Sequence, residues 1–440
     1  MSSPPTDETV ESRPPATRMG KAWLLTTASN GLLGLVIFVV SPWAANVLGP
    51  ERRGRLAAIQ LVPQMLADLA ALGLGFSIIH YGSARQTSLR ALLKWSFKQM
   101  AIGSLTMFTI GQILVGPILH RSNVDIPLMR TFLLICPVTA AFTVSSEVLR
   151  ALGDFRTWNL LVLGRGLLWP ISLVVGLTGL LGVSISGVLL TNLLCVTILS
   201  IFALRLAWRR TANGHDDPTT SKRQYTRYGM FSAVSTIPRT ANANLDQVIM
   251  SFSVARTDLG LYSAAVGWSS MTLPVMRGFT GIAMPHLSGA KPEELPSRVR
   301  QIITYSVAAA VALTAAGLAA TWALWNLRYG AAYHRAYLAA LILIPAGLFL
   351  ELNAILGNVI RSLHRPGLVA ILEAVVLTMS TSALFVALRY NAVVGPALVS
   401  LGTYSLACGI YCFAIAKLMN VRAISLLQPR LIRLPRRRTA

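Results

Sequence analysis

Charged residues are scarce in this sequence. Asp, Glu, Lys and Arg make up 12% of its 440 residues, about half of the roughly 25% found in soluble domains. Hydrophobic residues make up 54%, in long blocks, and the mean hydropathy is +0.60. So few charged residues cannot cover the water-exposed surface of a soluble protein of this size. The long apolar blocks exclude disordered and fibrous proteins as well. The composition indicates a polytopic membrane protein.

Acidic residues are the scarcer charge. The chain has 16 Asp and Glu against 39 Lys and Arg, a formal net charge of +23. Such an excess can indicate nucleic-acid binding, but here the basic residues lie mostly between apolar blocks and in the C-terminal run 436–438. Lys and Arg in those places are attracted to anionic lipid headgroups. We therefore expect membrane lipids, and no nucleic acid, as partners.

Cysteines and catalytic motifs are also few. The four cysteines all fall inside apolar segments without metal-ligand spacing, so we expect small buried side chains. The sequence has no phosphate-binding Gly-Lys-Ser/Thr motif, no HExxH and no Ser/His/Asp set, and its expected outside loops are short. These absences predict that the chain is not an enzyme, hydrolyses no ATP and carries no metal or other cofactor.

Twelve apolar segments reach the roughly 20 residues that a helix needs to cross a bilayer. They are 22–47, 57–82, 97–119, 128–149, 158–178, 183–207, 229–254, 259–286, 301–326, 334–360, 367–388 and 393–417. The hydrophilic stretches divide the chain into a disordered N-tail (1–21), an N-lobe (22–208), a linker (209–228), a C-lobe (229–418) and a basic C-tail (419–440). Tryptophans near the expected membrane edges, including Trp325, are predicted to be interfacial anchors.

The distribution of basic residues predicts the orientation. With the N-terminus inside, 27 of the 39 Lys and Arg residues fall in inside loops and tails, 9 in outside loops and 3 within spans. This bias places both tails and the linker in the cytoplasm. The largest exception is the expected first outside loop, residues 51–55, which holds three arginines.

An internal repeat relates the two halves of the chain. A shift of 206 residues places Gly54 on Gly260 and Gly75 on Gly281, and a shift of 211 places Arg150 on Arg361. Because six crossings preserve the direction of the chain, the repeat predicts two parallel six-helix lobes around an axis along the membrane normal. A binding site is then expected between the lobes, near the midplane.

Two stretches carry a resemblance to a known family. Residues 48–84, LGPERRGRLAAIQLVPQMLADLAALGLGFSIIHYGSA, resemble the first outside loop and second helix of Wzx-type polysaccharide-lipid flippases. Residues 242–288 resemble the seventh and eighth helices of these proteins more closely, through the pattern D-Q, apolar run, G-x-Y-x-x-A and a later Pro. This family belongs to the multidrug/oligosaccharidyl-lipid/polysaccharide exporter superfamily, with its MATE-like fold of twelve helices in two lobes around a central cavity.

The resemblance implies a function. Such a flippase carries a polyprenyl-diphosphate-linked oligosaccharide, an exopolysaccharide or O-antigen repeat unit, from the inner to the outer leaflet of the bacterial inner membrane by alternating access. Its partners would be this lipid-linked glycan, Na⁺ or H⁺ as a coupling ion, and the polysaccharide polymerase or glycosyltransferase machinery. Two alternatives remain open: an ion-coupled drug or organic-cation antiporter of the same superfamily, and a membrane-embedded glycan polymerase or glycosyltransferase.

Charged residues inside the expected spans are the candidate site residues, because a charge in the membrane is costly unless it has a function or a partner. A diphosphate needs a cationic cavity, and arginine binds phosphate bidentately. Arg239, Arg277 and Arg165 are therefore candidates for binding the anionic head group, or else partners of buried carboxylates. The carboxylates are candidates for ion coupling, or else buried counter-ions: Asp246, Asp68, Glu351, Glu147 and Glu373.

Overall fold

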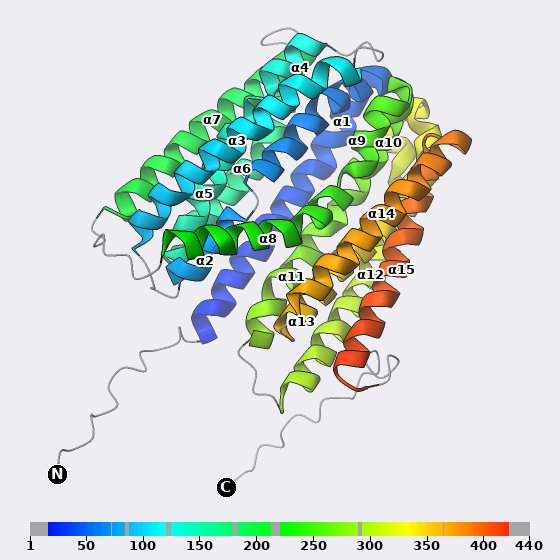
Figure 1. Ribbon diagram of the computed structural model, residues 1–440. Coiled ribbons are helices and arrows are strands. Elements are labelled where there is room, and N and C mark those ends of the chain that lie inside the picture. The colour runs from blue at the N-terminus through cyan, green and yellow to red at the C-terminus, as the bar shows by residue number, and fades with distance from the viewer. Residues whose placement is uncertain are drawn as a thin grey trace, which may run out of the picture.

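The computed structural model describes residues 16–71, 73–83, 88–119, 125–178, 184–212, 221–288, 293–363 and 365–421. Every regular element within these ranges is a helix (Figure 1), which confirms the all-α fold class. The helices are α1 Ala16–Ala70, α2 Leu74–Ser83, α3 Leu89–Leu119, α4 Ile126–Phe132, α5 Ile135–Ala151, α6 Phe155–Leu177, α7 Ile185–Arg210, α8 Lys222–Asn242, α9 Leu245–Ser253, α10 Arg256–Ser269, α11 Leu273–Ser288, α12 Leu295–Tyr329, α13 Tyr337–Ser362, α14 Pro366–Tyr390 and α15 Val394–Leu418, with short 3₁₀ helices η2 Ser270–Thr272 and η3 Ala331–Ala336.

Helix α1 consists of two helices joined at Gly49. Gly49 has φ 70° and ψ 168°, and glycine adopts such a positive φ without steric cost. Pro50 follows at the start of the second helix, where its missing N–H removes no hydrogen bond. Because one residue makes the turn, Glu51–Arg55 form the first helical turns. The prediction of an outside loop over residues 51–55 is therefore wrong.

Several expected spans are built from two shorter helices. Residues 57–82 comprise the end of α1 and α2, which are separated by a turn at Gly73 with φ 82°. The other composite spans are α4 with α5, α8 with α9, and α10 with α11. Of the helices in the described part of the chain, eight are long and apolar enough to cross a membrane. Helix α7 ends at Arg210 and α8 begins at Lys222, so helix continues into both ends of the expected linker.

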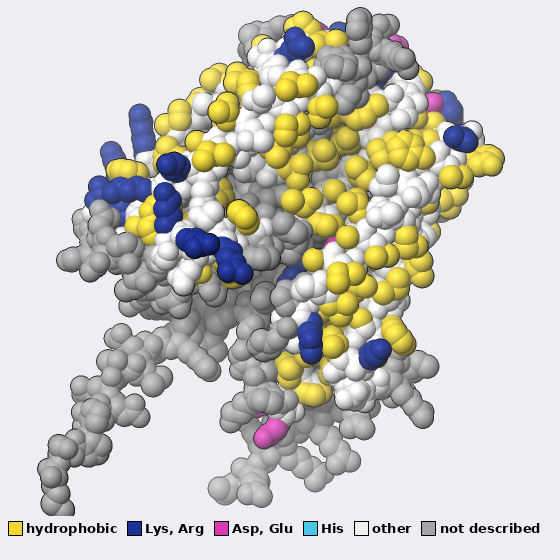
Figure 2. All heavy atoms as spheres, in the orientation of Figure 1, with side chains coloured by type: hydrophobic (Ala, Val, Ile, Leu, Met, Phe, Trp, Pro, Cys, Tyr) yellow, Lys and Arg dark blue, Asp and Glu magenta, His cyan; other side chains and the backbone are white. Residues whose placement is uncertain are grey.

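The outer surface of the helices is apolar. Figure 2 shows hydrophobic side chains spread over the face formed by the C-terminal helices. Large apolar side chains exposed on the surface include Leu105, Ile113, Val311 and Phe413. A soluble protein rarely exposes so much contiguous apolar surface, whereas a bilayer solvates it. Together with the eight apolar helices, this surface identifies a multi-pass membrane protein.

The helices form two groups that lie side by side (Figure 1). We call α1–α7 the N-terminal half and α9–α15 the C-terminal half; each contains a buried apolar cluster of its own, and a third cluster spans both. Helix α8 runs across the molecule and packs against α2 in one half and α14 in the other. The second part of α1 packs against α10 at the end of the molecule opposite the chain termini.

Aromatic side chains in the buried apolar cluster that spans both halves correct one prediction. Trp325 is fully buried, and its ring stacks on Tyr329 with centroids 4.4 Å apart. It also contacts the edge of Trp268, whose indole N–H donates a 2.8 Å hydrogen bond to Thr321. The expectation that Trp325 is an interfacial anchor is wrong, because hydropathy places a residue along a helix but does not show which helix face is packed inside.

Candidate functional site

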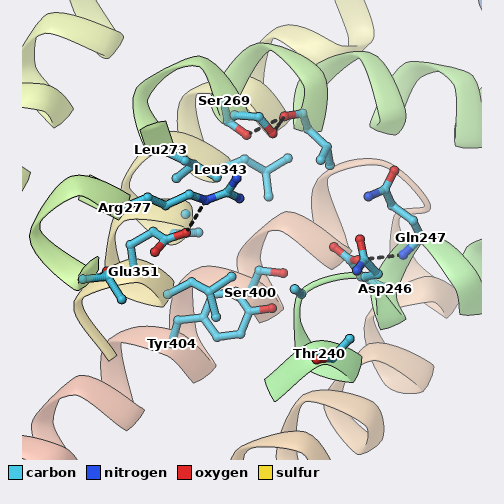
Figure 3. A pocket seen from close by; sticks show the side chains of 18 residues that line it. Thr240, Asp246, Gln247, Ser269, Leu273, Arg277, Leu343, Glu351, Ser400 and Tyr404 are labelled. Atoms are coloured by element: carbon cyan, nitrogen blue, oxygen red, sulfur yellow. Dashed lines mark hydrogen bonds and ion pairs between the residues drawn. The ribbon is translucent and has the colours of Figure 1, made fainter. Parts of the chain in front are cut away.

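A cavity of about 660 Å³ lies among helices of the C-terminal half (Figure 3). Its walls come from the ends of α8 and α9, from α10, η2 and α11, and from α13 and α15. The lining combines apolar side chains with charged and hydroxyl groups, including Arg277, Glu351, Asp246, Ser400 and Tyr404. Three of the candidate residues predicted from the sequence therefore line one cavity.

Arg277 and Glu351 form an ion pair on one side of this cavity. The guanidinium Nε of Arg277, on α11, donates to Glu351 Oε1, on α13, at 3.1 Å. The Arg277 side chain is 61% exposed, whereas that of Glu351 is 8% exposed. Glu351 Oε2 is buried and has no hydrogen-bond partner among the described residues. The arginine thus neutralises a buried carboxylate while most of its guanidinium remains accessible from the cavity.

Asp246 lies on the opposite side of the cavity, at the start of α9 (Figure 3). Its Oδ1 accepts a 2.7 Å hydrogen bond from the Gln247 backbone N–H, and its Oδ2 accepts one from the Tyr262 hydroxyl. No arginine or lysine forms an ion pair with Asp246 in the described chain. Asp246 is therefore held by neutral donors, an arrangement in which a carboxylate can take up a proton or a cation.

A second cavity of about 270 Å³ lies between the two halves. Its N-terminal wall comes from α1 and α6 and its C-terminal wall from α9, α10 and η2. Gln247, Val266 and Ser270 line both cavities, so the two adjoin. Arg53, in the helical turn that follows Gly49, lines the second cavity.

Arg53 is a candidate that the sequence-based reasoning missed. Residues 51–55 fall between the apolar segments 22–47 and 57–82, which predicts a water-exposed loop there. The signal that could have found Arg53 is the Gly49-Pro50 pair, since glycine often follows the end of one helix and proline often begins the next. Because the helix begins at Pro50, Arg53 lies at the end of its first turn and reaches the second cavity.

Among the predicted residues with described side chains, Arg165, Asp68 and Glu147 do not line these two cavities. Arg165 Nη2 donates a 3.4 Å hydrogen bond to Thr139. Asp68 accepts a 3.2 Å hydrogen bond from Gln64 and is close enough to Arg165 for their opposite charges to attract. Glu147 pairs with Arg150 at 3.5 Å, also in the N-terminal half.

Glu373, on α14, is buried near the first cavity but does not line it. Its carboxylate accepts hydrogen bonds from the Tyr411 hydroxyl at 3.0 Å and from Asn242 Nδ2 at 3.4 Å. Arg239 belongs to α8, and its side chain lies outside the described part of the structure. Its neighbour Thr240 lines the first cavity.

The chain matches a protein family over most of its length. Residues 19–290, more than half of the chain, match the model of the family described as polysaccharide biosynthesis protein. No curated protein matches the sequence. Among solved structures, the lipid II flippase MurJ in an inward closed conformation is 12% identical, with a TM-score of 0.66 over 92% of this chain and 89% of that one.

Two other structural matches are transporters. A MATE transporter of Vibrio cholerae, VcmN, is 14% identical, with a TM-score of 0.65 over 94% of this chain and 99% of that one. A MOP superfamily transporter from Pyrococcus furiosus is 14% identical, with a TM-score of 0.58 over 91% of this chain and 96% of that one. At this identity the structures establish the fold alone. With the family match, they confirm the resemblance to Wzx-like flippases that residues 48–84 and 242–288 indicated.

Proposed function

The chain belongs to the polysaccharide biosynthesis protein family, and on that premise we propose that it carries a polyprenyl-diphosphate-linked oligosaccharide, an exopolysaccharide or O-antigen repeat unit, to the outer leaflet of the bacterial inner membrane. In this proposal twelve membrane helices form two parallel six-helix lobes, corresponding to residues 22–208 and 229–418. Both termini face the cytoplasm. The lobes rock to expose the cavities first to one leaflet and then to the other.

The observation that carries the proposal is that Arg277, whose side chain is 61% exposed, lines a cavity of about 660 Å³ that also contains hydroxyl groups. A diphosphate cannot enter hydrocarbon without losing its hydration, so its carrier has to replace water with fixed cationic and hydrogen-bonding groups. Arg277 uses Nε to bind Glu351, which leaves its two Nη groups to bind an oxyanion. The hydroxyls of Ser269, Ser270 and Tyr404 line the same space. Each donates to a backbone carbonyl, so it has to exchange that bond before it can donate to the head group.

The remaining predicted residues have supporting roles in this proposal. Arg239 and Arg165 add positive potential along the path of the head group. Asp246, Glu373 and Asp68 are the carboxylates that exchange Na⁺ or H⁺ in the transport cycle, while Glu351 and Glu147 are counter-ions to arginines with which they pair.

A second function has its own support. Asp246 lines the cavity without a cationic partner in the described chain, and Glu351 keeps one buried oxygen unbound. Both features favour a cationic cargo, as in a drug or organic-cation antiporter. The difference between the two functions is the sign of the charge that the cavity binds.

Binding to the purified protein tests that sign. Fluorescent analogues of a short prenyl diphosphate and of an organic cation are titrated into wild type and into the double variant Arg277→Ala/Glu351→Gln. The flippase proposal predicts that the diphosphate analogue binds wild type and that the double variant loses about tenfold or more in affinity. Binding of the cation and not of the diphosphate analogue by wild type contradicts the proposal and supports the antiporter.

A further inference from the structure

Arg53 lies at the boundary between the two halves. Its Nη2 donates to Ser41 Oγ, in the first part of α1, at 3.3 Å and to the backbone carbonyl of Ser263, on α10, at 3.4 Å. Both bonds are long. Its Nε is buried and has no hydrogen-bond partner, and no carboxylate within the described ranges forms an ion pair with it.

The residue after Arg53, Gly54, lies in a close backbone contact between the halves. A Cβ atom added to Gly54 would lie 1.7 Å from the Arg256 carbonyl oxygen, and one added to Gly260 would lie 1.8 Å from that of Pro50. Each glycine also faces the backbone nitrogen of the other, because the added Cβ atoms would lie 2.9 and 2.8 Å from these nitrogens. The backbones of α1 and α10 therefore touch where no side chain fits.

Gly54 and Gly260 are the two residues that the internal repeat superimposes. Equivalent positions of two repeats meet when they lie next to the pseudo-twofold axis that relates them. The crossing thus lies next to this axis, at the end of the molecule opposite the chain termini. It brings α1 and α10, one helix from each half, into backbone contact at that end.

The Arg53 side chain lines the second cavity, but its unpartnered Nε is buried, so an oxyanion reaches the edge formed by Nε and Nη2 only when the groups packed against it separate. Oxyanions bind arginine bidentately, through two parallel N–H donors. The edge formed by Nε and Nη2 has one unused donor and one that is shared between Ser41 and Ser263. An oxyanion that takes this edge replaces the Ser263 carbonyl, which is the bond from Arg53 to the opposite half.

We propose that Arg53 is a second anion-binding residue that couples the arrival of a diphosphate to separation of the halves at the Gly54–Gly260 crossing. The ligand class rests on the proposed function. In the cycle, the head group leaves Arg277, passes Gln247 and Ser270 where the cavities adjoin, and binds Arg53. Loss of the Ser263 bond then releases α10 from α1, and the cavity opens toward the second leaflet.

Distances between spin labels test this coupling. Labels are placed at Ser186→Cys, at the start of α7, and Tyr390→Cys, at the end of α14, in a background in which the four native cysteines are replaced. Both positions are exposed and lie at the end where α1 crosses α10. The protein is reconstituted in nanodiscs and measured alone, with inorganic pyrophosphate, with farnesyl diphosphate and with uncharged farnesol.

The expected result is a longer distance with either diphosphate and no change with farnesol. A response to farnesyl diphosphate alone assigns the site to a lipid-linked anion, and an equal response to pyrophosphate assigns it to the diphosphate group itself. Arg53→Gln is expected to abolish the response, and Arg53→Lys to raise the half-maximal concentration about tenfold, since lysine lacks the bidentate edge. The matched control Arg55→Gln removes an exposed arginine that pairs with Asp125, and its response should equal that of wild type.

Gly260→Ala provides a test that does not depend on Arg53. The added methyl group clashes with the Pro50 carbonyl, so the long distance should be populated without ligand, whether Arg53 is retained or replaced by the Arg53→Gln substitution. A wild type that does not respond to either diphosphate, or an Arg53→Gln variant that responds as wild type does, overturns the proposal.

Transport separates this inference from the proposed function. If wild type moves a lipid-linked glycan and Arg53→Gln moves it equally well, the coupling is wrong and the flippase proposal stands. If the diphosphates open the wild type but no lipid-linked glycan is transported, the coupling stands and the proposed cargo is wrong.

Discussion

Removing Arg277 should destabilise the protein as well as the site, and the two effects can be separated. Glu351 is 6% exposed, and the Arg277 Nε is the group that pairs with its Oε1. Its Oε2 already has no partner. Arg277→Ala therefore leaves a buried carboxylate without its counter-ion.

The size of the loss follows from the geometry. Breaking a fully buried ion pair from one side costs about 3–5 kcal/mol, and a hydrogen bond to a charged group contributes about 1.5–3 kcal/mol. Because the Arg277 side chain is 61% exposed, water screens the pair and the smaller range applies. We expect Arg277→Ala to lower the free energy of unfolding by about 2 kcal/mol. At about 2–4 °C per kcal/mol for a unit of 150–250 residues, Tm falls by several degrees.

The double variant isolates the interaction. Glu351→Gln removes the charge that needs a counter-ion, so Arg277→Ala/Glu351→Gln should regain most of the lost stability. The measurement is thermal unfolding in detergent with a thiol-reactive dye, because Cys136 is fully buried in the folded protein. If the two substitutions are additive, with no coupling energy between them, the pair does not stabilise the site and the reasoning is refuted.

Three further outcomes are expected. Gly54→Ala should favour the state in which α1 and α10 separate at their crossing, since the added Cβ would lie 1.7 Å from the Arg256 carbonyl oxygen. A cysteine introduced at Ser270 should then react faster with a membrane-impermeant thiol reagent. An unchanged reaction rate would contradict this prediction. Trp325→Ala should lower the free energy of unfolding by about 3–5 kcal/mol, because the ring is fully buried; a change below about 1 kcal/mol, measured by the same thermal assay, would be inconsistent with its packing. If Glu373 exchanges the coupling ion, Glu373→Gln should keep the fold but slow ion-driven transport by about tenfold or more. Equal transport rates by wild type with and without an imposed ion gradient would show that Glu373 does not have that role.

Much of the fold follows from hydropathy and turn chemistry. Long apolar blocks determine helices and a membrane environment, and the hydrophilic stretch at the centre of the chain marks the change from one half to the other. What hydropathy does not show is rotation about the helix axis. Trp325 is predicted to be an anchor at the edge of a span; it lies near the end of α12, and its ring is fully buried inside the protein.

The candidate site was predictable only in part. A charge inside an apolar span indicates a function or a partner, and this rule makes Arg277, Glu351 and Asp246 candidates. The structure places all three around one cavity. The rule did not pair Arg277 with Glu351, because 74 residues separate them in the chain and their contact depends on the packing of α11 against α13. Arg53 was missed because a charge near a predicted span edge is ordinarily solvated.

Two residues that the internal repeat matches, Gly54 and Gly260, are in contact in the structure. The match of Gly54 with Gly260 indicated two similar halves, but equivalence in sequence does not require contact. The structure brings them together where α1 crosses α10, and a Cβ added at either position would overlap a backbone carbonyl of the other half. A sequence repeat does not show which of its matched positions come into contact, because this depends on how the halves pack.

Transport in proteoliposomes tests the central claim most directly. Labelled polyprenyl-diphosphate oligosaccharide is incorporated into one leaflet and its appearance in the other is followed, beside efflux of a cationic dye, for wild type and for Arg277→Ala/Glu351→Gln. We expect wild type to move the lipid-linked glycan, the double variant to remain folded and fail, and neither protein to move the dye. Dye efflux without movement of the lipid by wild type would contradict the flippase proposal and make Asp246 the centre of a cation-transport mechanism.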